Sequence, residues 1–129
     1  MKVGDLVAVY GSLRAGLGNH RLLETAKRQE DGIIPSGFCM YSLSAFPGLV
    51  KEEPSTNIVV EVYEIDTEQR IQRLDMLEGY PSFYDREEVT LEDGRVCWVY
   101  FLDKKSHHWP QVTDGDWLKY VRGDRNVDL

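Results

Sequence analysis

Two apolar runs joined by a short turn set the strongest limit on how this chain folds. The runs span residues 84–91 and 96–102, and Glu92-Asp93-Gly94-Arg95 separates them. An Asp-Gly step between apolar runs favours a β-hairpin, because these residues accept the backbone angles of tight turns. The chain therefore contains adjacent antiparallel strands, which favours an antiparallel or mixed sheet.

Other strands and a short helix are expected on the N-terminal side of the hairpin. Residues 5–10 form an apolar run that stops at Gly11, which is typical of a buried strand. Residues 31–43 predict a strand pair or one bent strand, and residues 57–65, rich in Val, Ile and Tyr, predict another strand. Asn19 is placed to cap a short helix that runs to about Lys27.

The clearest helix signal begins at Asp66. Asp66 and Gln69 have the spacing of a capping box, and the helix is expected to run to about Glu78. Gly79 is placed to end it, and Pro81 prevents it from restarting. Five or six strands and two short helices in this order predict an α+β fold, with a sheet that is mostly antiparallel or mixed.

Glu78 is a candidate general acid or base because of its position on this helix. At about 100° per residue, Ile71 and Leu74 define one apolar face, and Glu78 projects between them. Burial of a carboxylate raises its pKa towards the range that suits a general acid or base. The alternative is that Glu78, in the last turn, points to solvent, and helix geometry alone leaves both readings open.

Length and charge narrow the classes of partner. The chain has 129 residues, which suits a single domain over residues 1–129. Its formal net charge of -7 argues against nucleic acid or an anionic membrane surface as the main partner, because both attract basic patches. No apolar run approaches the length of a membrane span, and the first residues lack the apolar run of a signal peptide.

The two cysteines indicate a cytoplasmic location. Cys39 and Cys97 each lie in an apolar, strand-like run, and neither belongs to a CxxC motif. We expect two buried free thiols in a reducing cytoplasm, with a single disulfide as the alternative.

Several common catalytic motifs are absent from the sequence. Gly11 and Gly16 have the spacing of a P-loop, but Leu17 stands where that motif requires Lys. There is no GxSxG motif, and His107-His108 has no Cys at zinc-ligand spacing. We therefore expect neither a metal nor a cofactor. Asp75, three residues before Glu78, is expected to hold an Arg or backbone group rather than to form a catalytic carboxylate pair.

The turn after the first strand is a candidate binding loop. Tyr10-Gly11-Ser12-Leu13 follows the strand directly, and a glycine at such a position can expose backbone N–H groups to an anion. Most strand-Gly-Ser turns are only turns, so the loop by itself does not establish a site.

Taken together, these segments resemble the gamma-glutamylcyclotransferase-like family, and most closely its gamma-glutamylaminecyclotransferase branch. The resemblance covers nearly the whole chain in the family's order, and its most specific parts are residues 7–14 and residues 74–81. The blocks are residues 7–14 (VAVYGSLR), 18–23 (GNHRLL), 60–66 (VEVYEID), 74–81 (LDMLEGYP), 84–86 (YDR) and 115–117 (GDW).

The resemblance implies a small mixed β-barrel flanked by helices, with a cavity at one end. It implies an enzyme that releases an amine or amino acid from a gamma-glutamyl compound and forms 5-oxoproline, with a gamma-glutamylamine as the expected substrate. The family's catalytic glutamate corresponds to Glu78, its ligand-binding loop to Tyr10, Gly11, Ser12 and Leu13, and a pocket tyrosine to Tyr84. Ser12 replaces the threonine of many members and keeps the hydroxyl.

One carboxylate suffices for this chemistry, because the substrate's own alpha-amine attacks its gamma-carbonyl. Glu78 would take a proton from the ammonium group and return one to the leaving amine. The alternative is a non-catalytic small-ligand binding domain of the same fold. The sequence identifies neither the leaving group nor the oligomeric state, although a turn at Phe46-Pro47-Gly48 is placed to shape the leaving-group side.

Overall fold

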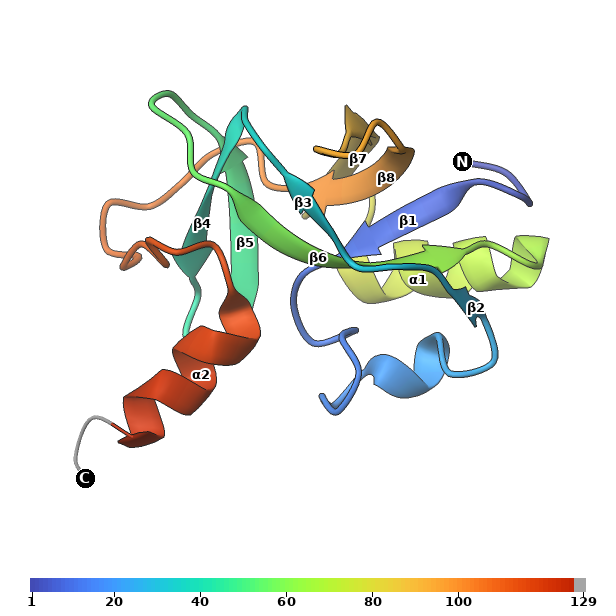
Figure 1. Ribbon diagram of the computed structural model, residues 1–129, viewed down its shortest axis with the longest axis horizontal. Helices are drawn as coiled ribbons and strands as arrows, with labels where there is room; N and C mark the ends of the chain where they lie inside the picture. Colours follow the sequence, from blue (N-terminus) through green and yellow to red (C-terminus); the bar gives the residue numbers. More distant parts are fainter. Residues whose placement is uncertain (127–129) are drawn as a thin grey trace.

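Most of the strands pair into one mixed sheet, with helices packed beside it (Figure 1). The structure, a computed structural model, describes residues 1–126. Residues 127–129, which belong to the predicted domain 1–129, lie outside the described residues. The strands are β1 (Leu6–Val9), β2 (Lys27–Arg28), β3 (Gly32–Ile34), β4 (Phe38–Ser42), β5 (Pro47–Lys51), β6 (Ile58–Glu64), β7 (Asp85–Thr90) and β8 (Val96–Phe101), and the helices are the 3₁₀ turn η1 (His20–Leu22), α1 (Glu68–Glu78) and α2 (Trp117–Asn126).

The larger sheet has the strand order β2-β6-β1-β8-β7, and β3 also pairs with β6. Strand β1 lies at its centre, antiparallel to β6 and parallel to β8. Strands β4 and β5 form a separate antiparallel pair. The predicted α+β fold with a mixed sheet is confirmed. Among the described strands the pairing is an open path from β2 to β7, so the closed barrel that the resemblance implied is not shown.

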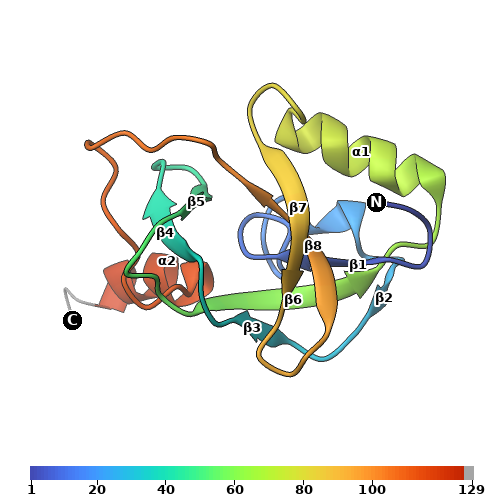
Figure 2. The ribbon, with the colours of Figure 1, turned by 90° about the horizontal axis from the view of Figure 1, so that it is seen from above.

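Alternating side chains of β1 contribute to two hydrophobic clusters, because successive residues of a strand point to opposite faces. Val7 and Val9 pack in one cluster with Ile71 and Leu74 of α1. Ala8 and Tyr10 belong to the other cluster, to which α2 contributes Trp117. Figure 2 shows α1 lying along one face of the sheet, with α2 at the far end beside β4 and β5. Strand β1 is therefore covered on both faces, and its C-terminal end lies near the end of α1.

The predicted hairpin is confirmed. Strands β7 and β8 pair antiparallel from Asp85↔Phe101 to Thr90↔Val96. Gly94 in the turn has a φ of 94°, in the left-handed region that favours glycine. The strand expected over residues 57–65 is β6, and the segment 31–43 contains two strands that pair with different partners, β3 with β6 and β4 with β5.

The helix predicted from Asn19 to about Lys27 is wrong. Only His20–Leu22 forms a 3₁₀ turn, and further turns carry the chain to β2. Asn19 does not cap a helix; its side-chain amide donates instead to Ser12 Oγ at 2.9 Å. A tertiary contact to the preceding loop thus replaces the local capping bond.

The helices differ from the prediction in two further details. The N-cap of α1 is Thr67, which accepts a hydrogen bond from the Arg70 N–H, while Asp66 forms an ion pair with the Arg70 side chain. The second α-helix is α2 at the C-terminal end, a segment for which no helix was expected from the sequence. No helix within residues 1–126 is long and apolar enough to cross a membrane.

Candidate active site

A cavity of about 360 Å³ lies beyond the C-terminal end of β1. Four segments meet there: the loop after β1, the turn between β4 and β5, the C-terminal end of α1, and the loop from α1 to β7. Its lining residues are Ala8, Val9, Tyr10, Gly11, Ser12, Leu13, Asn19, Ala45, Phe46, Pro47, Leu77, Glu78, Phe83, Tyr84 and Tyr100.

The end of α1 determines the position of Glu78, the last residue of that helix. Gly79 has a φ of 64° and ends the helix, because its N–H bonds to Met76 and the Tyr80 N–H donates to the Asp75 carbonyl at 2.9 Å. These two bonds form a Schellman motif, which reverses the chain direction immediately after Glu78.

Tyr84 returns to the helix end because the chain folds back after this reversal. The Phe83 N–H donates to the Gly79 carbonyl at 2.7 Å, and the Tyr84 N–H donates to the Glu78 carbonyl at 3.3 Å. The loop of residues 79–84 is thereby held against the helix end. Glu78 and Tyr84 consequently line the same cavity although a loop separates them.

The Glu78 carboxylate has no hydrogen bond or ion pair with any residue in the described part of the chain. Burial raises the pKa of Glu78 from 4.5 to about 7, because the ionised carboxylate loses hydration that no partner replaces. Glu78 is half-buried and lines the cavity, so of the two orientations that helix geometry left open the structure shows the inward one. A carboxyl group with this pKa exchanges protons readily at neutral pH.

Tyrosine side chains form the buried wall beside Glu78. The Tyr84 hydroxyl donates to the Pro47 carbonyl at 2.8 Å, and the Tyr10 hydroxyl donates to the Tyr100 carbonyl at 2.7 Å. Burial, and then the nearby Glu78 carboxylate, raise the pKa of Tyr84 above its usual value. Both phenols therefore stay neutral and hold fixed orientations in the cavity wall.

The loop after β1 has free backbone donors. Its three carbonyl groups are engaged: Gly11 O accepts from Arg14 N–H, Ser12 O from Asn19 N–H, and Leu13 O from the His20 ring. The N–H groups of Gly11, Ser12 and Leu13 make no hydrogen bond to another residue within 1–126. Successive unpaired N–H groups at a cavity wall are suited to bind an anion such as a carboxylate.

Gly11 also lies in close contact with the opposite wall. A Cβ atom at this position would lie 2.9 Å from the ring carbons of Pro47. That distance is shorter than real Cβ contacts allow, and the Pro47 ring has little freedom to move. The absence of a side chain at Gly11 thus sets how closely the binding loop approaches the β4–β5 turn.

A family model described as gamma-glutamyl cyclotransferase, AIG2-like, matches residues 7–119. The chain belongs to this family. The match includes every segment that surrounds the cavity, and it identifies the chain as an enzyme of the gamma-glutamylcyclotransferase type.

Curated relatives agree with this assignment, and a solved structure shares the fold. A protein of Methanocaldococcus jannaschii, provisionally named a gamma-glutamylcyclotransferase, is 39% identical over 121 residues, which cover 90% of this chain and 98% of that protein. A gamma-L-glutamyl-butirosin B gamma-glutamyl cyclotransferase of Niallia circulans is 26% identical over 121 residues, covering 87% of this chain and 74% of that protein. The crystal structure of an uncharacterized protein from Pyrococcus horikoshii superimposes with a TM-score of 0.79 at 27% identity, covering 95% and 97% of the two chains.

The cyclotransferase residues predicted from the sequence meet at this one cavity. Tyr10-Gly11-Ser12-Leu13, Glu78 and Tyr84 all line it. Phe46 and Pro47, which were expected to shape the leaving-group side, line it as well. The catalytic and binding roles of these residues stay predictions, and their shared location is what the structure adds.

Asp75 is separate from the cavity and has the structural role expected for it. Its carboxylate accepts from the Tyr100 hydroxyl at 2.6 Å and forms an ion pair with Arg86 at 3.1 Å. Its charge is thus already compensated, and among the residues of 1–126 that line the cavity Glu78 supplies the one carboxylate.

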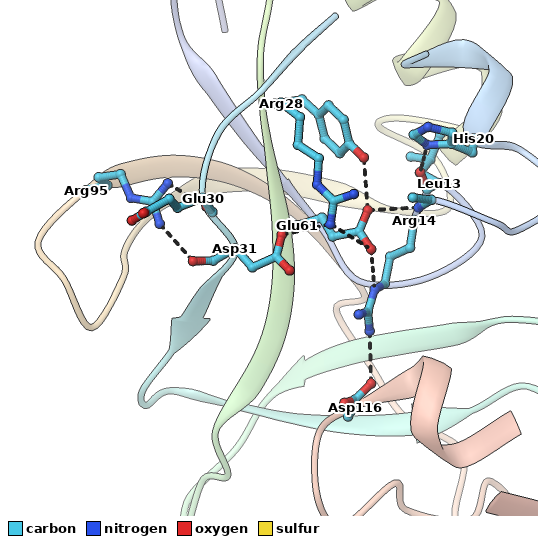
Figure 3. Close-up of polar contacts among 11 residues, drawn as sticks. Leu13, Arg14, His20, Arg28, Glu30, Asp31, Glu61, Arg95 and Asp116 are labelled. Carbon is cyan, nitrogen blue, oxygen red and sulfur yellow. Dashed lines mark hydrogen bonds and ion pairs between the residues drawn. The ribbon is translucent and has the colours of Figure 1, made fainter. Parts of the chain in front are cut away.

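Glu61 was not identified from the sequence, and it holds the residues that directly follow the binding loop (Figure 3). This β6 residue is 2% exposed and accepts from the Ala15 N–H at 2.8 Å, from Arg14 Nε at 3.0 Å and from the Tyr63 hydroxyl at 2.9 Å. Arg14 continues the chain of contacts to Asp116 at 2.9 Å. Residues 14 and 15, directly after the loop, are therefore tied to the centre of the sheet.

The protonation of Glu61 follows from these contacts. Burial acts to raise the pKa of its carboxyl, but the hydrogen bonds from Ala15, Arg14 and Tyr63 outweigh burial and lower the pKa below its usual value. The signal in the sequence was an acidic residue between Val60 and Val62, in the apolar middle of the strand. An acid in such a run requires a partner, but the sequence does not say which one.

Proposed function

We propose that this chain, as a single domain, converts a gamma-glutamylamine into 5-oxoproline and the free amine. The observation that carries the proposal is the Glu78 carboxyl, which has a pKa of about 7 and faces a cavity beside a loop with free N–H groups. The family membership supports gamma-glutamyl chemistry, and the cavity supports a single proton-transferring residue.

In the proposed reaction, the alpha-amine of the glutamyl group attacks its own gamma-carbonyl carbon. A C–N bond forms to close the five-membered ring, and the C–N bond to the leaving amine breaks. Glu78 accepts a proton from the substrate's ammonium group and delivers one to the departing nitrogen. Ring closure within one molecule gains from proximity, so the cavity's task is to hold the reactive rotamer.

The backbone donors of the loop have a defined place in this scheme. The N–H groups of Gly11, Ser12 and Leu13 bind the alpha-carboxylate of the glutamyl group, and the wall of Tyr10 and Tyr84 confines its methylene chain. This arrangement directs the gamma-carbonyl towards Glu78. The buried free thiols of Cys39 and Cys97 fit the expected action in the cytoplasm.

The test is release of 5-oxoproline from a panel of gamma-glutamylamines and gamma-glutamyl dipeptides by the purified protein. We expect turnover by the wild type and by Glu24→Gln, which removes an exposed carboxylate, and a loss of about 10²-fold or more in Glu78→Gln with its thermal melting transition retained. Stabilisation of the protein by these compounds without any product would support the alternative, a non-catalytic binding domain. Wild-type rates in Glu78→Gln would refute the assigned mechanism.

A further inference from the structure

The residues that line the cavity are of two chemical kinds. The Gly11–Leu13 loop, Asn19 and the Glu78 carboxylate supply its polar groups, which we call the polar side. Ala45, Phe46, Leu77 and Phe83 are apolar, and we call them the apolar rim.

The apolar rim contains the most exposed residues of the cavity lining. Phe83 is 51% exposed and Leu77 is 39% exposed, whereas Tyr10, Tyr84 and Tyr100 in the cavity wall are buried. Single exposed apolar residues are common on protein surfaces. Here, however, exposed apolar residues from the β4–β5 turn, from α1 and from the α1–β7 loop all line one cavity.

Aromatic contacts define the position of the rim. The Phe46 and Phe83 rings meet edge to face, with centroids 6.2 Å apart, and Phe83 packs in the same way on Tyr84 at 4.9 Å. Phe83 is therefore anchored to a wall residue of the cavity while much of its ring faces solvent. An apolar group that leaves the cavity in this direction would cover exposed aromatic surface.

Within the described residues, the cavity offers no positive side chain to a second carboxylate. Among its lining residues, all within the described part of the chain, none is Lys, Arg or His. Arg14 and Arg86, from adjoining segments, form ion pairs with Glu61 and Asp75. The chain also carries a net charge of -7. A leaving group with its own carboxylate would thus place an unpaired anion near Glu78, which is unfavourable in a partly desolvated site.

We infer that the cavity selects gamma-glutamyl derivatives of apolar monoamines, with an alkyl or arylalkyl group that packs against Phe46, Leu77 and Phe83. This inference rests on the proposed function and specifies its substrate class. The glutamyl part lies against the polar side and becomes 5-oxoproline. The amine nitrogen receives its proton from Glu78, and the amine departs past the apolar rim.

Matched substrates test the inference on the wild-type protein. Gamma-L-glutamyl-phenethylamine and gamma-L-glutamyl-L-phenylalanine differ only by the carboxylate on the leaving group, and gamma-L-glutamyl-methylamine lacks the apolar extension. We expect kcat/KM for the phenethylamine derivative, measured by 5-oxoproline release, to exceed that of each of the other two by about tenfold or more.

Two substitutions at Phe83 locate the selectivity. Phe83→Ala should lower the ratio of kcat/KM between the phenethylamine and methylamine derivatives, because it removes the ring that covers the apolar group. Phe83→Arg should raise kcat/KM for the phenylalanine derivative relative to the phenethylamine derivative, because it supplies a cation at the apolar rim. The exposure of Phe83 makes both variants compatible with folding, which a thermal melt verifies.

The outcomes separate the two proposals. Equal or higher kcat/KM for the phenylalanine derivative would overturn the inference while the proposed function stands. Selectivity ratios that both Phe83 variants leave unchanged would likewise overturn the role of the rim. If none of the three compounds releases 5-oxoproline, the proposed function itself fails, and the inference fails with it.

Discussion

Replacing Glu78 with Gln should make the protein more stable than the wild type, and increasingly so as the pH rises. In the folded protein the Glu78 carboxyl has a pKa of about 7, against 4.5 for the ordinary carboxyl. Between these values the folded protein holds a proton that the unfolded chain has released, so the free energy of unfolding falls with pH. Gln does not titrate and avoids this loss.

The interval between the two pKa values gives the size of the effect. Each pKa unit corresponds to about 1.36 kcal/mol, so the wild type should lose about 3 kcal/mol relative to Glu78→Gln as the pH rises from 4.5 through 7. Below pH 4.5 the carboxyl is protonated in both states, and the difference should be constant. Above pH 7 it is ionised in both states, and the difference should again be constant.

Urea denaturation of both proteins between about pH 4 and about pH 9 measures this difference. Glu24→Gln is the matched control, because it removes one exposed carboxylate elsewhere on the surface. A stability difference for Glu78→Gln that stays flat across this range would show that the carboxylate is hydrated in the folded protein. The reasoning from burial would then be refuted, whatever the enzyme activity.

Three further substitutions test the site and its support. Gly11→Ala should lower kcat/KM by about tenfold or more, because its Cβ displaces the opposite wall, whereas Gly18→Ala, which meets nothing within 4 Å, should retain activity in the 5-oxoproline assay. Glu61→Gln should lower the free energy of unfolding by about 3 kcal/mol near pH 7, and this loss should shrink below pH 4.5, when equilibrium urea denaturation is repeated across pH. Leu74→Ala should cost about 3–5 kcal/mol in the same assay, because Leu74 is fully buried, while Met76→Ala at an exposed position of the same helix should cost less than about 0.5 kcal/mol.

Local signals in the sequence were sufficient where short-range geometry decides the structure. The Asp93-Gly94 step predicted the hairpin, since the glycine accepts a backbone angle that other residues avoid. Gly79 predicted the end of α1 for the same reason. Helical periodicity predicted the buried stripe of Ile71 and Leu74. Each of these features depends on residues within a few positions of one another.

Signals from the family pattern extended the prediction to the site. The resemblance joined the Gly11–Leu13 loop, Glu78 and Tyr84 into one set, and the structure places all of them at one cavity. Residue spacing alone left Glu78 undecided between the protein interior and solvent. Its orientation depends on the chain reversal at Gly79 and on the walls supplied by other segments, which helix periodicity does not describe.

The local elements and the family could be read from the amino-acid sequence, whereas tertiary contacts determine how these elements form the cavity. Asn19 bonds to Ser12 instead of capping a helix, and Glu61 takes partners from the loop after β1. A polar side chain can form hydrogen bonds of similar energy with several different partners, and only the packed fold brings one set of partners within hydrogen-bonding distance. Glu78 is the opposite case: the apolar and neutral groups of the cavity wall leave its carboxylate without a partner among residues 1–126, and its pKa is about 7.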